Sequence, residues 1–94
     1  MNEITSDELI RESMLQVNDL IVGHEANIKA HELEREANAH DCLSRPGEDE
    51  IHFYRDRKLL QKIRLEQSKI ALLTEKQKEL EFSIDTMKEV AMAE

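Results

Sequence analysis

The sequence is poor in the residues that build a thick globular core or a cross-linked one. It contains no Trp, two Phe and one Tyr, and aromatic residues make up 3% of its 94 residues. A chain of this length has room for one small domain, and so few large side chains leave little bulk for a layered core. Cys42 is the single cysteine, which excludes an intrachain disulfide, so stability must come from packing or from a second subunit.

Glycine and proline are also scarce, with two Gly and one Pro in the chain. Gly23 and Gly47 stand alone, so no phosphate-binding glycine loop or paired-glycine nucleotide motif occurs. What the sequence has instead is 36% charged residues together with abundant Leu, Ile, Gln and Ala. This composition favours long solvated helices over sheets and predicts an all-α fold.

Long apolar runs are absent as well. Crossing a bilayer takes about 20 consecutive apolar residues, and no such run is found. The N-terminal residues Met1, Asn2 and Glu3 lack the basic region and apolar stretch of a secretory signal. We therefore expect a cytoplasmic protein.

The second half of the chain carries a coiled-coil seam. Apolar residues recur at alternating spacings of four and three, which keeps one narrow stripe facing a partner helix over about five heptads. The stripe consists of Leu59, Ile63, Glu66, Ile70, Leu73, Gln77, Leu80, Ile84, Met87 and Ala91.

The first half carries a matching seam. Thr5 and Glu8 form a predicted capping box, and Ile4 and Leu9 a hydrophobic staple, so the helix is expected to begin near Ser6. Its stripe becomes polar toward the end and consists of Ile10, Met14, Val17, Ile21, His24, Ile28, His31, Arg35, Asn38 and Cys42.

The segment 44–50 separates the two seams and contains Pro46 and Gly47. These residues predict a turn, with a helix over about 6–43, the turn over about 44–49 and a second helix over about 50–92. Folding back there gives a single antiparallel coiled-coil hairpin in which facing residue numbers add to about 94, for example Ile21 with Leu73. The alternative is an extended helix pair formed only between two chains.

Polar residues within the seams suggest a buried network. In this register Glu66 lies opposite Ile28, between His24 and His31, so the three polar side chains could interact and specify register or make association depend on pH. The alternative is an open, hydrated seam.

His40, Cys42 and His52 are the only conceivable metal cluster. A fourth ligand and a zinc-finger spacing are both missing, so we expect no metal and no cofactor. Gly23 costs about 1 kcal/mol inside a helix and could permit either close helix contact or a bend.

Charge identifies two candidate surfaces. The formal net charge is −8, and acidic residues gather at the open end of the predicted hairpin, where they either keep the protein in solution or bind a basic surface on another protein. Together with two aromatic residues near the turn, the candidate partner-binding residues are Glu8, Glu12, Glu75, Glu79, Glu81, Asp85, Phe53 and Tyr54.

A basic stripe runs along the second helix. It consists of Arg55, Lys58, Lys62, Lys69 and Lys76. Such a stripe could contact phosphates, although intramolecular salt bridges are the ordinary explanation, and no aromatic residues interleave for base stacking.

A further set of apolar residues lies off both seams, where a single hairpin leaves them in contact with water. Covering them with a second copy predicts a homodimer, as a four-helix bundle or an antiparallel coiled coil. The set consists of Leu15, Val22, Leu33, Leu65, Leu72 and Phe82.

No arrangement of nucleophile, base and orienting group is apparent, so we predict no enzyme. The predicted function is a non-enzymatic protein-binding module, a small acidic dimeric inhibitor or modulator of a larger protein machine, including one that processes nucleic acid. The alternatives are a chaperone or structural adaptor that shields a client helix, and a nucleic-acid binder that uses the basic stripe.

Overall fold

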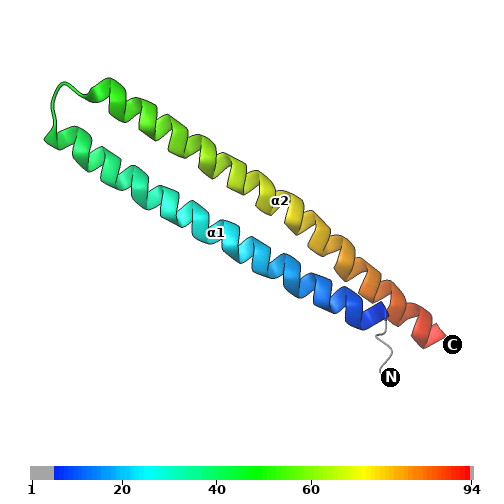
Figure 1. Ribbon diagram of the computed structural model, residues 1–94. Coiled ribbons are helices and arrows are strands. Elements are labelled where there is room, and N and C mark those ends of the chain that lie inside the picture. Colours follow the sequence, from blue (N-terminus) through cyan, green and yellow to red (C-terminus); the bar gives the residue numbers. More distant parts are fainter. Residues whose placement is uncertain (1–5, 94) are drawn as a thin grey trace.

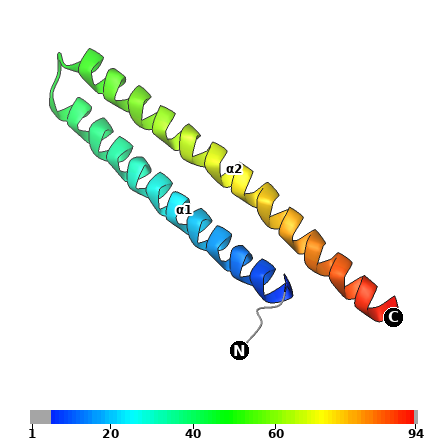
Figure 2. The same ribbon diagram turned by 45° about the vertical axis from the view of Figure 1, so that its right-hand side comes forward.

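The protein is a helical hairpin. The computed structural model describes residues 6–93, with side chains through residue 90, and contains helix α1 (Ser6–Ser44) followed by helix α2 (Asp49–Ala93). The two helices lie side by side and run in opposite directions, with the start of α1 and the end of α2 at the same end of the molecule (Figures 1 and 2). No strand occurs among the described residues. The predicted all-α antiparallel hairpin is confirmed, while the expected capping box and staple involve Ile4 and Thr5, which lie outside the described residues.

The turn between the helices is short and held by backbone hydrogen bonds. Arg45 donates its amide to the carbonyl of Asp41 at 3.0 Å, and the amide of His52 donates to the carbonyl of Glu48 at 3.2 Å. Gly47 has a φ of 97°, a left-handed conformation that residues with a side chain rarely adopt. Pro46 has no amide proton to continue α1, so the chain reverses within 45–48.

The core is a single line of side chains between the helices. Its buried apolar residues are Val17, Ile21, Leu59, Ile63 and Ile84. Every other residue of the two predicted seams whose side chain is described is half-buried, except Met87, which is 38% exposed. The alternating spacing therefore located the interface, because only one face of each helix contacts the other.

The seam of α2 begins earlier than Leu59, where the sequence analysis placed its start. His52 is 4% exposed and Asp56 is half-buried. Both continue the alternation of four and three back from Leu59, but their polar character hid them from a search for apolar residues. The first turns of α2 therefore belong to the interface.

The expected register, in which facing residue numbers add to about 94, is wrong at the polar contacts between the helices. There the helices are shifted by one layer of the seam. Contacts between the helices join His24 to Glu66, Arg35 to Asp56 and Asn38 to His52, pairs whose numbers add to 90 or 91. Each seam residue lies between two residues of the facing helix, so apolar periodicity alone cannot choose between adjacent layers. Hydrogen bonds, which require one particular partner, make that choice.

Candidate functional site

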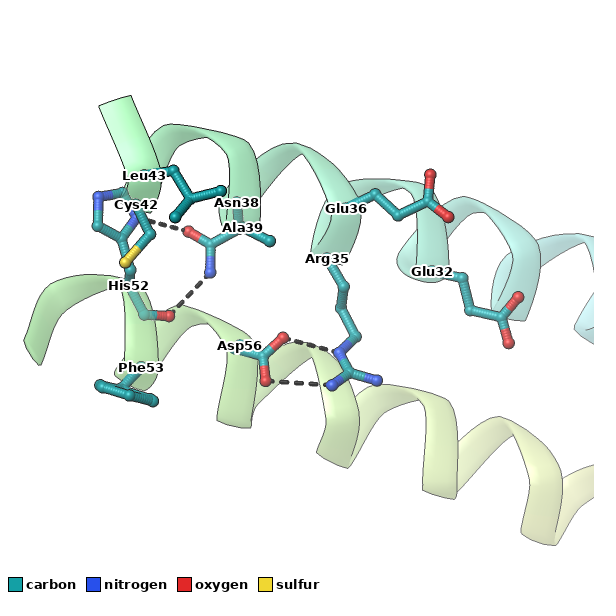
Figure 3. Close-up of a pocket in the computed structure, with 10 residues that line it drawn as sticks. All are labelled: Glu32, Arg35, Glu36, Asn38, Ala39, Cys42, Leu43, His52, Phe53 and Asp56. Carbon is teal, nitrogen blue, oxygen red and sulfur yellow. Dashed lines mark hydrogen bonds and ion pairs between the residues drawn. The ribbon is translucent and has the colours of Figure 1, made fainter. Parts of the chain in front are cut away.

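A hollow on one side of the hairpin lies next to the turn and receives side chains from both helices (Figure 3). We call it the turn-end hollow. It is an open groove of about 760 Å³. Its lining residues are Glu32, Arg35, Glu36, Asn38, Ala39, Cys42, Leu43, His52, Phe53 and Asp56.

An ion pair crosses the turn-end hollow. Arg35 donates from Nε to Asp56 Oδ1 at 2.7 Å and from Nη2 to Asp56 Oδ2 at 3.2 Å, as the two dashed lines in Figure 3 show. The hydrogen bond from Arg35 holds the pKa of the Asp56 carboxyl below its usual value, and the same bond raises the pKa of Arg35. Both side chains are 37% exposed, so water screens the pair, and its planar two-bond geometry fixes orientation more than it adds stability.

Asn38 and His52 form a reciprocal pair in the wall of this hollow. The Asn38 amide nitrogen donates to the His52 carbonyl at 2.8 Å, and its amide oxygen lies 2.8 Å from His52 Nδ1. Because an amide oxygen only accepts, His52 Nδ1 carries a proton. His52 Nε2 is buried and makes no hydrogen bond, with the Glu48 carboxylate 3.7 Å away. An imidazole enclosed in this way holds the helices together and offers no accessible base.

Cys42 is held as a thiol. It donates to Asp49 Oδ1 at 3.6 Å, and burial, followed by this contact with Asp49, raises the pKa of the thiol above its ordinary value. A protonated thiol is a weak nucleophile and a poor metal ligand. His40, the third member of the conceivable metal cluster, is exposed. Within the part of the chain that the structure describes, no group of three His, Cys, Asp or Glu side chains could hold a metal ion.

The predicted network joins Glu66 to both His24 and His31, and the structure contains the contact with His24. His24 Nδ1 contacts Glu66 Oε2, and the pKa of the Glu66 carboxyl is lowered chiefly by this hydrogen bond. Smaller contributions come from a hydrogen bond with Asn27 and the charge of Lys69, while burial opposes the shift. His31 Nδ1 lies 3.5 Å from Glu34 on its own helix, so the structure pairs Glu66 with His24 and places His31 next to another carboxylate.

A second hollow, the open-end hollow, lies near the chain ends and also has a volume of about 760 Å³. It is lined by Arg11, Met14, Leu15, Asn18, Gln77, Glu81, Ile84, Asp85 and Lys88. Two of the predicted partner-binding residues, Glu81 and Asp85, are therefore part of its wall.

The other acidic candidates lie outside the open-end hollow. Glu75 pairs with Lys78 at 3.4 Å, and Glu79 pairs with Lys76 at 3.8 Å. Glu8 and Glu12 are exposed on α1. All six acidic candidates are exposed, but neighbouring lysines neutralise part of the charge.

The basic stripe faces acidic residues of α1. Arg55, Lys58 and Lys62 line a third, smaller hollow together with Glu34 and Asp41. Lys69 lies 4.0 Å from Glu66, and the Lys58 ammonium lies 4.7 Å from the centre of the Tyr54 ring. The ordinary explanation, charge pairing within the chain, therefore holds for Lys69 and for Lys76, while the other three stripe residues lie near acidic side chains of α1.

The six predicted dimer residues are all exposed, from 54% for Val22 to 73% for Leu72. They do not form one continuous patch. Leu15 and Val22 are one heptad apart on α1, Leu65 and Leu72 are one heptad apart on α2, and Leu33 and Phe82 occupy other heptad positions.

Sequence reasoning missed Asn38, His52 and Asp56 as a cross-helix cluster. The signal that could have found them is the spacing of four and three, followed upstream from Leu59 without regard to polarity. Gly23 is exposed, and a Cβ built there would meet nothing within 4 Å, so close contact with α2 does not explain it.

No helix in the described part of the chain is both long and apolar enough to cross a membrane.

Comparison with known proteins found no family model, no curated protein and no solved structure that matches this chain.

Proposed function

We propose that this chain is a non-enzymatic protein-binding module, a small acidic hairpin that self-associates and inhibits or modulates a larger protein machine in the cytoplasm. The observation that carries the proposal is the number of large apolar side chains left on the surface. Leu43 is 83% exposed, Phe53 and Leu72 are each 73% exposed, and Phe82 is 72% exposed. Leu43 and Phe53 line the same turn-end hollow, and apolar side chains exposed together in this way are typical of sites that contact other proteins.

Electrostatics indicates the chemistry of the partner. A net charge of −8 repels nucleic acid and attracts a basic protein surface. Glu75 and Glu79 stand on the outside of α2, beyond both larger hollows, where such a surface can reach them. A machine that itself binds nucleic acid offers a basic groove of this kind, which supports it as a partner class.

The polar groups between the helices support a binding role over a catalytic one. The His52 imidazole is enclosed, and the Cys42 thiol has a raised pKa. These two groups are therefore occupied in joining the helices, whereas His40 is exposed near the turn.

The proposal is tested by capturing proteins on the tagged full chain in its native host, with and without nuclease treatment. Glu75→Lys with Glu79→Lys reverses two charges at the open end without changing a residue of either larger hollow. Glu25→Lys with Glu50→Lys makes the same change in net charge elsewhere on the exposed surface. We expect the first variant to reduce recovery of a stoichiometric partner at least about tenfold and the second to leave recovery within about twofold.

Equal recovery with both variants would contradict the role of the acidic end. Recovery that disappears after nuclease treatment would favour the nucleic-acid alternative and the basic stripe. A captured partner that contributes a single helix, insensitive to both charge variants, would favour the chaperone or adaptor alternative.

A further inference from the structure

The turn-end and open-end hollows lie on the same side of the hairpin. On α1, Glu32 and Ala39 of the first hollow are separated from Arg11 and Asn18 of the second by whole heptads. Residues separated by whole heptads occupy the same lateral position on a coiled-coil helix. On α2 the same relation connects Phe53 with Glu81 and Lys88, so both helices place the two hollows on one side.

The third hollow lies on the opposite side. Its residues Glu34 and Asp41 are one heptad apart, as are Arg55 and Lys62, and none of these positions matches those of the other two hollows. One side of the hairpin therefore brings basic residues of α2 next to acidic residues of α1. The other side carries two hollows of equal size.

The rim of each larger hollow bears a protruding apolar side chain. Phe53 is 73% exposed at the turn-end hollow, where Figure 3 shows it at the outer edge, and Leu15 is 67% exposed at the open-end hollow. The observed register places Phe53 level with residues 37–38 of α1. The midpoint between this level and Leu15 falls near Ala26, close to the middle of α1.

A twofold axis through that midpoint would exchange the two rims. A second copy, turned end over end, would place its Phe53 at the open-end hollow of the first and its Leu15 at the turn-end hollow. The reciprocal contacts follow from the same rotation, which is the condition for an isologous interface. Such a rotation would therefore bring the protruding rim of each copy over a hollow of the other.

The exposed area supports a partner of this size. The chain exposes 7,710 Å² of surface, whereas a compact monomer of 11.0 kDa exposes about 5,600 Å². A standard protein interface covers about 800 Å² of each partner, so the excess of about 2,000 Å² accommodates a second copy and leaves surface for another protein.

Charge distinguishes the two possible directions. The turn-end hollow has Glu32 and Glu36 in addition to the Arg35–Asp56 pair and is therefore acidic, whereas in the open-end hollow Arg11 and Lys88 balance Glu81 and Asp85. Placing turn over turn would bring the glutamates of the two copies together. Placing turn over open end keeps these glutamates apart and sets each acidic hollow over one without net charge, which is the more favourable arrangement.

We propose that two copies of this chain pack through the side that carries both hollows, turn end over open end, with Phe53 of each copy in the open-end hollow of the other. This inference rests on the self-association included in the proposed function and defines its surface. It assigns Leu15, Val22 and Phe53 to the contact and leaves Leu65 and Leu72 outside it.

Sedimentation equilibrium of the full chain tests the surface. We expect the wild-type protein to have twice the mass of 11.0 kDa. Leu15→Asp and Phe53→Asp should each raise the dimer dissociation constant at least about 30-fold, since charge would enter an apolar contact. Leu72→Asp, at an equally exposed position outside the contact, should change it less than about threefold. All three positions are exposed in the hairpin, and circular dichroism verifies that each variant stays helical.

Pulsed electron spin resonance tests the direction. Cys42→Ser removes the native thiol and keeps a hydroxyl to bond Asp49, and Arg45→Cys then places one spin label at the turn of each copy. If the turn end of each copy lies over the open end of the other, the two labels are separated by about 60 Å, given a rise of about 1.5 Å per residue. A distance shorter than half of the 73 Å length of the molecule overturns the proposed direction.

Equal weakening by Leu15→Asp and Leu72→Asp would overturn the proposed surface. Wild-type protein that stays at 11.0 kDa up to about 100 μM would overturn the dimer. Either result leaves the partner-capture experiment of the proposed function free to succeed, because its charge variants lie outside both hollows.

Discussion

The half of the helix interface next to the turn and the half next to the chain ends are built from different side chains. Near the turn, Asn38 bonds His52, Arg35 bonds Asp56, and farther along His24 contacts Glu66. Toward the open end the seam consists mainly of apolar residues such as Val17, Ile21, Leu73 and Ile84. The half next to the turn also buries Leu59 and Ile63, but it adds hydrogen bonds that select particular partners, whereas the other half excludes water without directional preference.

This contrast indicates that the choice of register comes mainly from the half next to the turn, while apolar burial stabilises both halves. Apolar burial contributes about 25 cal/mol per Å² and is nearly indifferent to which layer faces which. A hydrogen bond contributes a modest net energy, but leaving its buried donor or acceptor unpaired is costly. The hydrogen-bonded half should therefore set the register, while apolar burial along both halves supplies the stabilising energy.

The largest expected effect comes from truncating the apolar half. Ile21 is 9% exposed, and Ile21→Ala should lower the free energy of unfolding by about 2–4 kcal/mol because it removes buried methylene groups and leaves a cavity. Urea denaturation followed by circular dichroism at fixed protein concentration measures the change. Leu20→Ala, at a neighbouring position that is 55% exposed, should change stability by less than about 0.5 kcal/mol. Equal losses at the two positions would remove the assigned role of the seam.

The next largest effect should come from removing the hydrogen bond between Asn38 and His52. Asn38→Leu leaves the buried His52 Nδ1 without its acceptor and should cost about 1–3 kcal/mol in the free energy of unfolding. Asn38→Leu combined with His52→Leu replaces the pair with an apolar contact and should recover most of that loss. The measurement is a double-mutant cycle from urea denaturation. A double variant less stable than Asn38→Leu alone would show that the pair contributes net stability as well as register.

The two glycines, one inside α1 and one in the turn, should respond in opposite directions. Gly23→Ala should raise the free energy of unfolding by about 0.5–1 kcal/mol, because a Cβ meets nothing within 4 Å and restricts the unfolded chain. Gly47→Ala should lower it by about 1–2 kcal/mol, because its φ of 97° strains any residue with a side chain. Thermal denaturation of the two variants gives the signs. A loss of stability in Gly23→Ala would indicate a close contact at this position that the isolated hairpin does not make, such as one with another chain.

The smallest expected effect is a loss of stability at low pH that comes from Glu66 and Asp56. The folded-state pKa of Glu66 is lowered below its ordinary 4.5, so its contribution is complete above that value and is lost as pH falls through the lower folded-state pKa. Asp56 has the same sign below its ordinary 3.8. Glu66→Gln should reduce the decline in stability below about pH 4.5, measured by urea denaturation from pH 6 to 3. Glu75→Gln makes the same charge change on the exposed surface and should leave the decline as in the wild type.

The fold was predictable because each helix leaves its own trace in the sequence. Spacings of four and three mark the buried face of α1 from Ile10 to Cys42, and Pro46 with Gly47 marks the reversal. The start of the α2 interface was not predictable from apolar residues, since His52 and Asp56 are polar. The register was mispredicted because the seam residues repeat along both helices. Shifting one helix by one layer again brings seam residues face to face, so the spacing does not distinguish the two registers.

The candidate site was predictable only in part. The exposure of the acidic open-end residues and of Leu15, Val22 and Leu72 follows from their positions off the seam, and the His24–Glu66 contact follows from two polar residues on facing stripes. The division of these exposed side chains between two sides of the hairpin required the helices to be placed next to one another. The two equal hollows became visible only then, because each is lined by residues far apart in the chain.

The sequence by itself determined that this protein is a pair of long helices joined at Pro46 and Gly47, since periodicity and turn propensity are local properties of the chain. Only the tertiary structure decided that Asn38 bonds His52 and Arg35 bonds Asp56, and which exposed residues share a side. The physical reason is that hydrophobic burial depends on the pattern of residues along a helix, whereas a hydrogen bond depends on the position of one atom relative to another.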